Sequence, residues 1–338
     1  MFRDYLKKII QRQDLNDSEM AELITDIFSG TITESQIGAF MAALATKGET
    51  FEELAGAARA MRRKALRVQA KSSTVVDTCG TGGDGSHTFN ISTTTAFVVA
   101  GCGITVAKHG NRSISSQCGS ADLLEALGVN LDVPPEITEE CIQEIGIGFL
   151  FAPKFHGAMK YAAKPRKEVG IRSIFNMLGP LTNPASANCQ LLGVYRSELT
   201  EMFANALRIL GTTRALVVHG HDGLDEISVC APTRISEVKD HLIHTYDIYP
   251  EHFFGEIADP TEIKGGNPQT NADITKAILS GKKGPKRNIV LINSAAALLA
   301  AGKAKDLKHG IDLAESSIDS KKALQKLLDL IQFTQHQA

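Results

Sequence analysis

The sequence predicts an α/β protein in which a small N-terminal helical domain is hinged to a large α/β domain with a mostly parallel central sheet. Two observations predict this fold. Residues 1 to about 70 carry only helical patterns, whereas from about Ser73 short β-branched runs alternate with helical stretches. Such alternation is typical of parallel βα units. At 338 residues, the chain is long enough for one large domain and a smaller one.

Helix starts in the N-terminal region are marked by a capping residue that Glu or Gln follows within three positions. They are Asp17-Ser18 with Glu19, Thr33 with Gln36, and Thr50 with Glu53. Apolar residues recur at spacings of three and four within the stretches that follow, for example over 37–44. This region is therefore expected to form a bundle of amphipathic helices.

The strands of the predicted sheet are short apolar runs. The parallel strands are expected at Thr74–Val76, Gly103–Ala107, Gly148–Phe151 and Arg214–His219. Short antiparallel strands are expected at Ile227–Cys230, Ile235–Val238 and Leu242–Ile248. Helices return from about Asn271 and include the Ala-rich stretch Asn293–Ala304.

One helical segment, Arg166–Asn183, interrupts the alternation and stops at Gly179-Pro180. We expect it to join the N-terminal helices. The helical domain would then comprise residues 1–70 with 166–186, and the α/β domain residues 71–165 and 187–338. A discontinuous small domain of this kind leaves a cleft between the two domains.

Composition narrows the class of protein. Hydrophobic residues make up 43% and charged residues 22%, and the formal charge of −2 gives no long-range attraction to nucleic acid or acidic membranes. The six cysteines form no C-x-x-C pair, which favours reduced thiols in a cytoplasmic protein. No apolar run reaches the ~18 residues that a membrane span needs, and the N-terminus does not resemble a signal peptide.

The first candidate site is the glycine-rich turn 80–84 (GTGGD), between a predicted strand and a helix that begins near a capping Asn90. Glycines and a helix N-terminus together favour anion binding. The turn lacks the Lys of a nucleotide P-loop, and Asp84 would repel a dinucleotide pyrophosphate. An acid in this place indicates a bound cation or a ligand hydroxyl. The alternative is a plain βα turn.

Two further candidate segments follow neighbouring strands, at the edge of the sheet where ligands bind. Residues 108–116 (KHGNRSISS) offer two cations, an amide and hydroxyls for a phosphate, and Ser120 is expected to cap the next helix. Asp225-Glu226 offers two adjacent carboxylates for one or two Mg²⁺ ions. The alternatives are a solvated polar turn and a solvated acidic turn.

Six motifs occur together, in one order: DTCGTGGD, NIST, KHGNRSISS, GSADLLEALG, GIRSIFNMLGPLTNP and GLDEIS. With them the chain resembles the anthranilate phosphoribosyltransferase family of tryptophan biosynthesis, from the helical N-terminus to about Ile331. The resemblance implies a fold like that of nucleoside phosphorylases and phosphoribosyltransferases, Mg²⁺ as cofactor, and a homodimer formed through the helical domain.

The resemblance also implies roles for single residues. Phosphoribosyl pyrophosphate (PRPP) would contact Gly80, Gly83, Asp84, Thr88, Asn90, Ile91, Ser92, Thr93, Lys108, His109, Gly110, Asn111, Arg112, Ser113, Ile114, Ser115, Ser116 and Ser120. Anthranilate would contact Gly80, Asn111 and Arg166, the last through its carboxylate. Ser92, Asp225 and Glu226 would hold one or two Mg²⁺ ions, and Lys108 and Asp84 would be the catalytic residues.

The implied reaction moves a phosphoribosyl group from PRPP to the amine of anthranilate. The sequence offers no obvious catalytic dyad, so we expect catalysis by electrostatics and positioning, with a closing hinge that excludes water. Two other functions are alternatives to this transferase activity. A nucleoside phosphorylase of similar architecture would use inorganic phosphate and need no Asp-Glu magnesium pair, and a non-catalytic protein could retain the fold.

Overall fold

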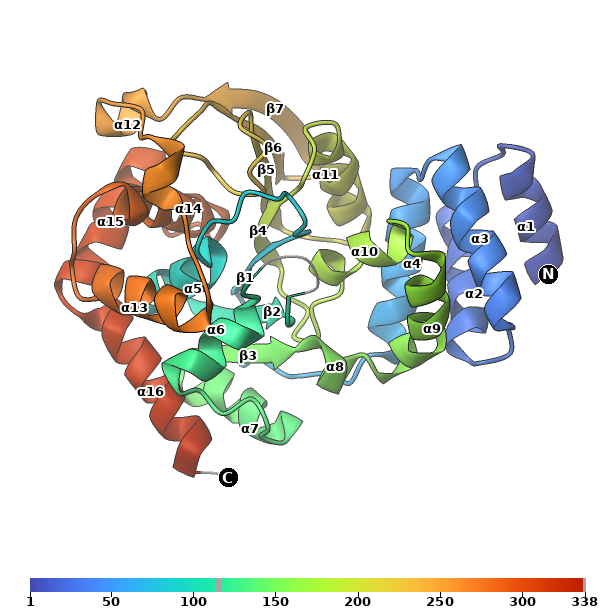
Figure 1. The fold of residues 1–338 in the computed structure, drawn as a ribbon, viewed down its shortest axis with the longest axis horizontal. Helices are drawn as coiled ribbons and strands as arrows, with labels where there is room; N and C mark the ends of the chain where they lie inside the picture. The colour runs from blue at the N-terminus through green and yellow to red at the C-terminus, as the bar shows by residue number, and fades with distance from the viewer. Residues whose placement is uncertain (114–116, 337–338) are drawn as a thin grey trace.

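The computed structural model describes residues 1–113 and 117–336. Its first helices form a bundle at one end of the molecule, and the α/β part forms the other end (Figure 1). The bundle contains α1 (Phe2–Ile10), α2 (Asp17–Phe28), α3 (Glu34–Lys47) and α4 (Phe51–Lys64).

The predicted helix starts in the bundle are correct at two places and wrong by one residue at the third. Capping boxes open α3 at Thr33 and α4 at Thr50. In α2 the capping residue is Asn16, not Asp17-Ser18, because the Asn16 side chain accepts a hydrogen bond of 2.9 Å from the backbone nitrogen of Glu19. An Asn side chain is as good a cap as Asp or Ser, so the pattern alone left the position open by one residue.

The described strands form one seven-stranded sheet, in the order β3-β2-β1-β4-β5-β6-β7. They are β1 (Val75–Gly80), β2 (Thr105–Gly110), β3 (Ile147–Phe151), β4 (Cys189–Gly193), β5 (Arg214–Gly220), β6 (Thr233–Lys239) and β7 (Leu242–Ile248). Neighbours from β3 to β5 pair in parallel, and β6 and β7 are antiparallel to their neighbours. The mostly parallel sheet is confirmed.

Two strand predictions need correction. Strand β4 was not predicted, although it lies between β1 and β5 at the middle of the sheet. The predicted strand Ile227–Cys230 is wrong, because the segment is irregular. The side chain of Asn293 bonds both the backbone nitrogen and the backbone oxygen of Ile227, at 2.9 Å each. These backbone groups are therefore satisfied by a side chain instead of a neighbouring strand.

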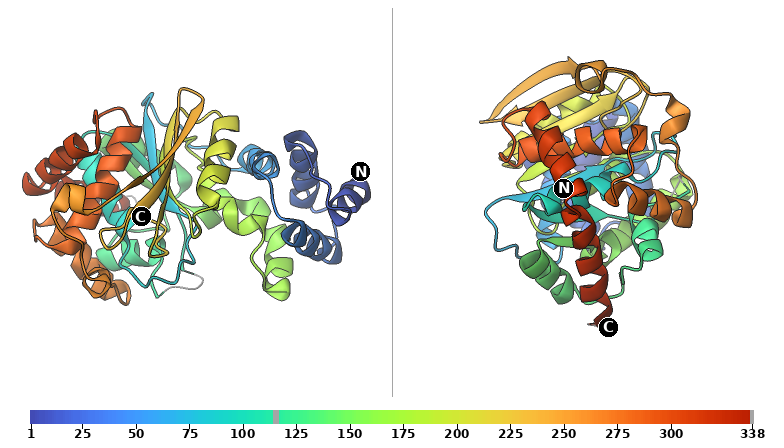
Figure 2. Two further views of the ribbon diagram at one scale, coloured as in Figure 1. Left: turned by 90° about the horizontal axis from the view of Figure 1, so that it is seen from above. Right: turned by 90° about the vertical axis from the view of Figure 1, so that its left-hand side faces the viewer.

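Helices cover both faces of the sheet. Figure 2 shows α5, α14 and the other C-terminal helices on one face, and α11 with the helical bundle on the other. The helices of this part are α5 (Ile91–Gly101), α6 (Ser120–Leu127), α7 (Pro135–Glu140), α8 (Ala152–Phe155), α11 (Leu199–Ile209), α12 (Glu251–Phe254), α13 (Pro268–Leu279), α14 (Pro285–Ala300), α15 (Leu307–Asp319) and α16 (Lys322–His336). The Ala-rich helix α14 begins earlier than predicted.

A connecting segment links the bundle to the sheet. It contains α9 (Lys160–Val169) and α10 (Ile174–Met177), and α9 packs against α2 and α3. The ring of Phe175 lies 6.2 Å from that of Phe28 and 6.4 Å from that of Phe40. The helical segment predicted at Arg166–Asn183 therefore does pack with the N-terminal helices, but it is broken after Val169, where Gly170 takes a φ of 67°.

Among the helices of the described residues, none is both long and apolar enough to cross a membrane.

Candidate active site

The glycine-rich loop after β1 meets the acidic turn after β5. The backbone nitrogen of Gly82 donates a hydrogen bond of 2.8 Å to Oδ2 of Asp225. This approach needs glycine in two adjacent strands. A Cβ on Gly80 would lie 2.5 Å from Asp225 Oδ2, and one on Gly193 would lie 1.5 Å from the Asp225 backbone oxygen. Gly80 and Gly193 stand opposite each other in the pairing of β1 with β4.

Three carboxyl groups gather at this meeting point. Burial and the neighbouring Asp84 raise the pKa of Asp225 to about 7. Burial and Asp225 raise the pKa of Glu226 well above its usual range, while the backbone nitrogen of Ser92 donates to Glu226 Oε1 at 3.1 Å. So much negative charge in one place favours a bound cation.

The donor set fits Mg²⁺. Carboxylate and hydroxyl oxygens are the ligands that Mg²⁺ prefers, and this ion keeps several waters or substrate oxygens. Within the described residues, no group of three or more His, Cys, Asp or Glu side chains is arranged so that it could hold a metal ion. Asp225, Glu226 and Ser92 would therefore hold the ion together with substrate oxygens.

Lys108 lies beside this acidic group at the end of β2. Its side chain is buried, and its Nζ donates to the backbone oxygen of Thr78 and lies 3.4 Å from Ser92 Oγ. Burial lowers the pKa of Lys108, and the nearby carboxyl groups of Asp77 and Glu226 counteract that effect. The structure thus brings the predicted catalytic Lys108 to the predicted metal ligand Ser92.

The side chain of His109 contacts other residues than the side chain of Lys108 does. Its imidazole Nδ1 lies 3.0 Å from the backbone oxygen of Gly179, and its Nε2 lies 3.2 Å from Nε2 of His156. Burial lowers the pKa of His109 to about 3 and that of His156 to about 4, so both rings are neutral at pH 7. The side chain of His109 thus contacts this second histidine, and within the described residues it makes no hydrogen bond to the glycine-rich loop.

Two of the predicted PRPP contacts in the first turn of α5 are buried. Because the side chains of Ile91 and Thr93 are buried, a bound anion would meet the backbone of these residues and not their side chains. Asn90 does not cap α5 with its side chain. Instead its Nδ2 donates to the backbone oxygen of Cys118, and its Oδ1 accepts from Asn271, each at 3.0 Å. The contact of Asn271 with Asn90 was not predicted, because Asn271 lies on α13, far from Asn90 in the sequence.

The loop after β2 is tied to α6. Ser120 does not cap this helix as expected, since the helix begins there and the capping residue is Gly119. Ser120 Oγ accepts from the Asn111 backbone nitrogen at 3.2 Å and donates to its oxygen at 3.1 Å. Arg112 forms two hydrogen bonds to Glu125, of 2.6 and 2.7 Å. The predicted contacts Ile114, Ser115 and Ser116 lie outside the described residues.

Arg166 lies on α9, in the segment that links the bundle to the sheet. Burial lowers the pKa of its guanidinium. Within residues 1–113 and 117–336, no side chain or backbone oxygen forms a hydrogen bond or ion pair with that guanidinium. A half-buried cation of this kind is suited to a carboxylate ligand.

Comparison with known proteins agrees with this geometry. A model of a glycosyl transferase family a/b domain matches residues 72–324, and one of the helical bundle domain of such a family matches residues 3–65. An anthranilate phosphoribosyltransferase of Desulfosudis oleivorans is 70% identical to the chain, over 99% of both proteins. The chain belongs to the anthranilate phosphoribosyltransferase family. One from Syntrophobacter fumaroxidans is 66% identical over 99% of both.

Solved structures of anthranilate phosphoribosyltransferases share the whole fold. That from Thermus thermophilus superposes with a TM-score of 0.93 at 41% identity, covering 98% of this chain and 99% of the other. That from Saccharomyces cerevisiae, in complex with PRPP and Mg, gives 0.90 at 30% identity, covering 99% and 98%. The fold predicted from the sequence is therefore confirmed.

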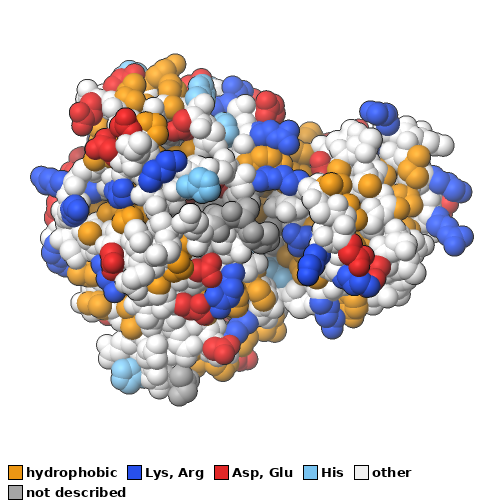
Figure 3. Space-filling model, in the orientation of Figure 1, with side chains coloured by type: hydrophobic (Ala, Val, Ile, Leu, Met, Phe, Trp, Pro, Cys, Tyr) orange, Lys and Arg blue, Asp and Glu red, His pale blue; other side chains and the backbone are white. Residues whose placement is uncertain are grey.

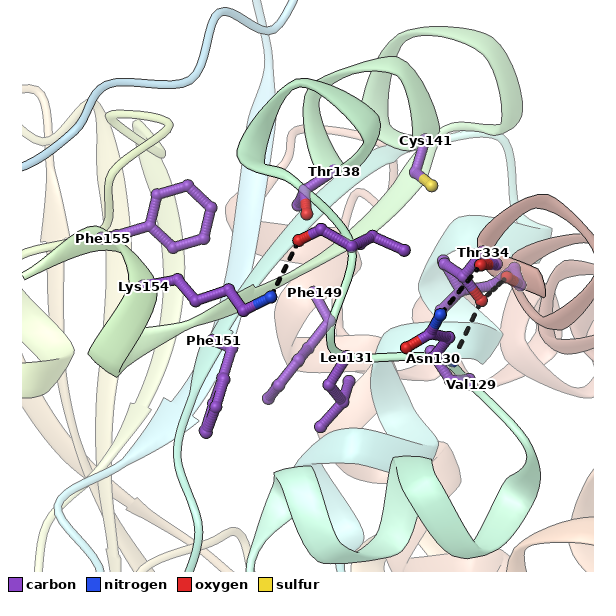
Figure 4. Close-up of a pocket in the computed structure, with 12 residues that line it drawn as sticks. Val129, Asn130, Leu131, Thr138, Cys141, Phe149, Phe151, Lys154, Phe155 and Thr334 are labelled. Atoms are coloured by element: carbon purple, nitrogen blue, oxygen red, sulfur yellow. Dashed lines mark hydrogen bonds between the residues drawn. The ribbon is translucent and has the colours of Figure 1, made fainter. Parts of the chain in front are cut away.

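A separate pocket lies between α7, β3 and α16, and it is mostly apolar (Figure 4). Its one charged side chain among the lining residues, Lys154, already donates to the backbone oxygen of Val133 at 3.0 Å and pairs with Asp132 at 3.1 Å. The pocket contains none of the residues predicted for substrate binding. By contrast, Lys and Arg side chains are exposed beside the junction of the helical bundle and the α/β part in Figure 3. We therefore do not propose that this pocket binds a substrate of the anthranilate phosphoribosyltransferase reaction.

Proposed function

We propose that this enzyme transfers the 5-phosphoribosyl group of PRPP to the amine of anthranilate, in the biosynthesis of tryptophan. The products are N-(5-phosphoribosyl)anthranilate and pyrophosphate. The observation that carries the proposal is the contact of Asp225 with the glycine-rich loop, beside the pair Lys108 and Ser92. This contact would join an acidic cation site to a phosphate-binding loop.

The chemistry is a displacement at the anomeric carbon of the ribose. A bond forms between that carbon and the anthranilate nitrogen, and the bond to the pyrophosphate oxygen breaks. The electron pair leaves with pyrophosphate, and the amine gives up one proton to solvent. The amine of anthranilate is neutral at pH 7, so no strong general base is needed.

Asp225, Glu226 and Ser92 would hold one or two Mg²⁺ ions. Bound Mg²⁺ would neutralise charge on pyrophosphate. Lys108 is buried beside these residues, so its ammonium acts in surroundings of low dielectric constant, where one charge stabilises another strongly. Asp84, at the end of the glycine-rich turn, would hold a PRPP hydroxyl or a second cation.

The two substrates would approach from different elements. PRPP would bind to the loops after β1 and β2 through the residues named above, from Gly80 to Ser120. Anthranilate would contact Gly80, Asn111 and Arg166. The guanidinium of Arg166, which has no partner among the described residues, would bind its carboxylate. A hinge between residues 1–70 with 166–186 and the rest of the chain would bring Arg166 towards PRPP and exclude water.

We also propose that the protein is a homodimer formed through the helical domain and that it acts in the cytoplasm. The cysteines support the second point, since Cys79, Cys102, Cys141, Cys189 and Cys230 are free thiols that are buried or half-buried. Free thiols of this kind are usual in a reducing compartment.

The reaction is tested by incubating the purified protein with anthranilate, PRPP and MgCl₂ and measuring both products. Equal amounts of phosphoribosylated anthranilate and pyrophosphate are expected. Replacing PRPP with inorganic phosphate and a nucleoside tests for a phosphorylase. Release of free base in that mixture, with no reaction of anthranilate, would contradict the proposal.

A further inference from the structure

A guanidinium from the connecting segment holds the glycine-rich loop. Arg172 lies between α9 and α10, and its Nη2 donates a hydrogen bond of 2.7 Å to the backbone oxygen of Gly83. Gly83 has a φ of 74°, and a Cβ there would lie 1.8 Å from the same Nη2. The guanidinium thus occupies the space that a side chain at position 83 would fill.

An aromatic ring orients this guanidinium. The Cζ atom of Arg172 lies 3.9 Å from the centroid of the Tyr195 ring, a cation–π contact. Tyr195 follows β4, and the last residue of β4, Gly193, accepts a hydrogen bond of 2.9 Å from the Thr81 backbone nitrogen. Because the ring and the loop are anchored to the same strand, the ring fixes the guanidinium plane relative to the Gly83 carbonyl.

Three of the hydrogen bonds that join the loop to other parts of the chain differ in origin. Asp225 accepts from the Gly82 nitrogen at 2.8 Å, and Lys264 donates to the Ser86 oxygen at 2.6 Å; both come from the C-terminal half of the chain. Arg172 comes from the segment that carries α9, which packs against α2 and α3 of the bundle. This contact therefore ties the position of the loop to that of the helical part (Figure 1).

We propose that Arg172 is a positioning residue for the transferase reaction: it holds the glycine-rich loop in the shape that binds PRPP, with Tyr195 orienting it. The inference rests on the proposed function. Without Arg172 the loop keeps its glycines and its contact with Asp225 but loses the support on its helical side. PRPP must then order the loop as it binds, and that ordering reduces its affinity.

The contact adds little to global stability. Arg172 and Gly83 are both exposed, and an exposed polar contact typically contributes little to the free energy of folding. Arg172→Ala is therefore expected to fold normally. A change in loop order can then be separated from unfolding.

The first measurement is hydrogen–deuterium exchange of the substrate-free protein. Arg172→Ala is expected to speed the exchange of amides within 82–86 while leaving the central strands unchanged. Tyr195→Leu should have the same effect to a smaller degree, and Tyr195→Phe, which keeps the ring, should not. Arg196→Ala is the matched control, because its Cζ lies 5.3 Å from the same ring and its side chain makes no hydrogen bond to the described part of the loop.

The second measurement is kinetic. Arg172→Ala is expected to raise the KM for PRPP about tenfold, which corresponds to ~1.4 kcal/mol of loop ordering. The KM for anthranilate at saturating PRPP should change by less than about twofold, because Arg166 is untouched. Arg172→Lys keeps the positive charge but loses the planar guanidinium group, so it should behave like the Ala variant.

The outcomes separate this inference from the proposed function. A wild-type protein inactive with PRPP and anthranilate would overturn the function, and with it the role of Arg172. In an active protein, unchanged loop exchange in Arg172→Ala would overturn the positioning role. Full recovery by Arg172→Lys would also overturn it, because charge alone would then account for the effect.

Discussion

Asp225 Oδ2 accepts a hydrogen bond of 2.8 Å from the backbone nitrogen of Gly82, across 143 residues of sequence. The bond joins the proposed metal site to the proposed phosphate loop. A change in one of these two sites is therefore expected to affect the other.

The double substitution Asp225→Asn with Glu226→Gln is expected to abolish magnesium dependence and to lower kcat/KM at least about 100-fold, the scale of losing one strong electrostatic contact in a transition state. The amides keep an oxygen that can accept from Gly82, so the loop remains supported. Initial rates over a MgCl₂ titration give the result. Asp240→Asn is the control, since it makes the same change in the turn between β6 and β7. A double variant still activated by Mg²⁺ would refute the metal assignment.

Magnesium activation is expected to weaken below pH 7. Burial and Asp84 raise the pKa of Asp225 to about 7, so a proton competes with the metal below that pH. The Mg²⁺ concentration for half-maximal activity should rise at least about tenfold for each pH unit below 7, because Glu226, whose pKa is also raised, takes up a proton as well. Activity measured across this pH range at several Mg²⁺ concentrations provides the test.

The same raised pKa predicts a stability effect with a definite sign. The folded state binds a proton at Asp225 more tightly than the unfolded chain does. Without metal, the free energy of unfolding is therefore expected to fall through this group as pH rises from about 4 to about 7. Mg²⁺ should restore that stability. The increase in Tm on adding MgCl₂ is therefore expected to be larger at pH 8 than at pH 6. An equal increase at both pH values would contradict the role of Asp225 in binding the metal.

Arg166→Ala is expected to raise the KM for anthranilate by about 10- to 100-fold, the range expected when a charge-assisted hydrogen bond worth ~1.5–3 kcal/mol is lost. The KM for PRPP should stay within about twofold. Steady-state kinetics with each substrate varied in turn will decide, with the adjacent exposed Lys167→Ala as the control. Equal effects on both KM values would rule out the assigned role.

Gly193→Ala is expected to destabilise the fold by about 1–3 kcal/mol, as overpacking typically does. Its Cβ would lie 1.5 Å from the Asp225 backbone oxygen. Gly157→Ala is the matched control, because a Cβ there meets no atom within 4 Å. Thermal unfolding monitored by circular dichroism should show a lower Tm for the first variant only. A Tm near that of wild type for Gly193→Ala would show that the acidic turn can move aside.

Much of the site was predictable because its parts follow strands. The glycine-rich turn, Lys108 and Asp225-Glu226 each come after an apolar run, and parallel strands bring such turns to one edge of a sheet. The central strand β4 was missed, since its sequence CQLLG lacks β-branched residues and its pairing depends on partners far along the chain. The irregular segment at Ile227 was misread because the side chain that bonds it, Asn293, lies 66 residues away.

Contacts made by long polar side chains were beyond prediction from the sequence. Arg172 meets Gly83 across 89 residues, and Asn271 meets Asn90 across 181. Neither pair has a local pattern, because each depends on how separate elements pack. Ser120 shows the same limit at short range, since it bonds to Asn111 instead of capping its own helix.

The proposed transfer of a phosphoribosyl group to anthranilate can be followed by the fluorescence of anthranilate in the presence of the purified wild-type protein. We predict that fluorescence falls only when PRPP and Mg²⁺ are both present, and that chelating Mg²⁺ during the reaction stops the decay. Consumption of anthranilate without PRPP, or an undiminished rate after chelation, would contradict it.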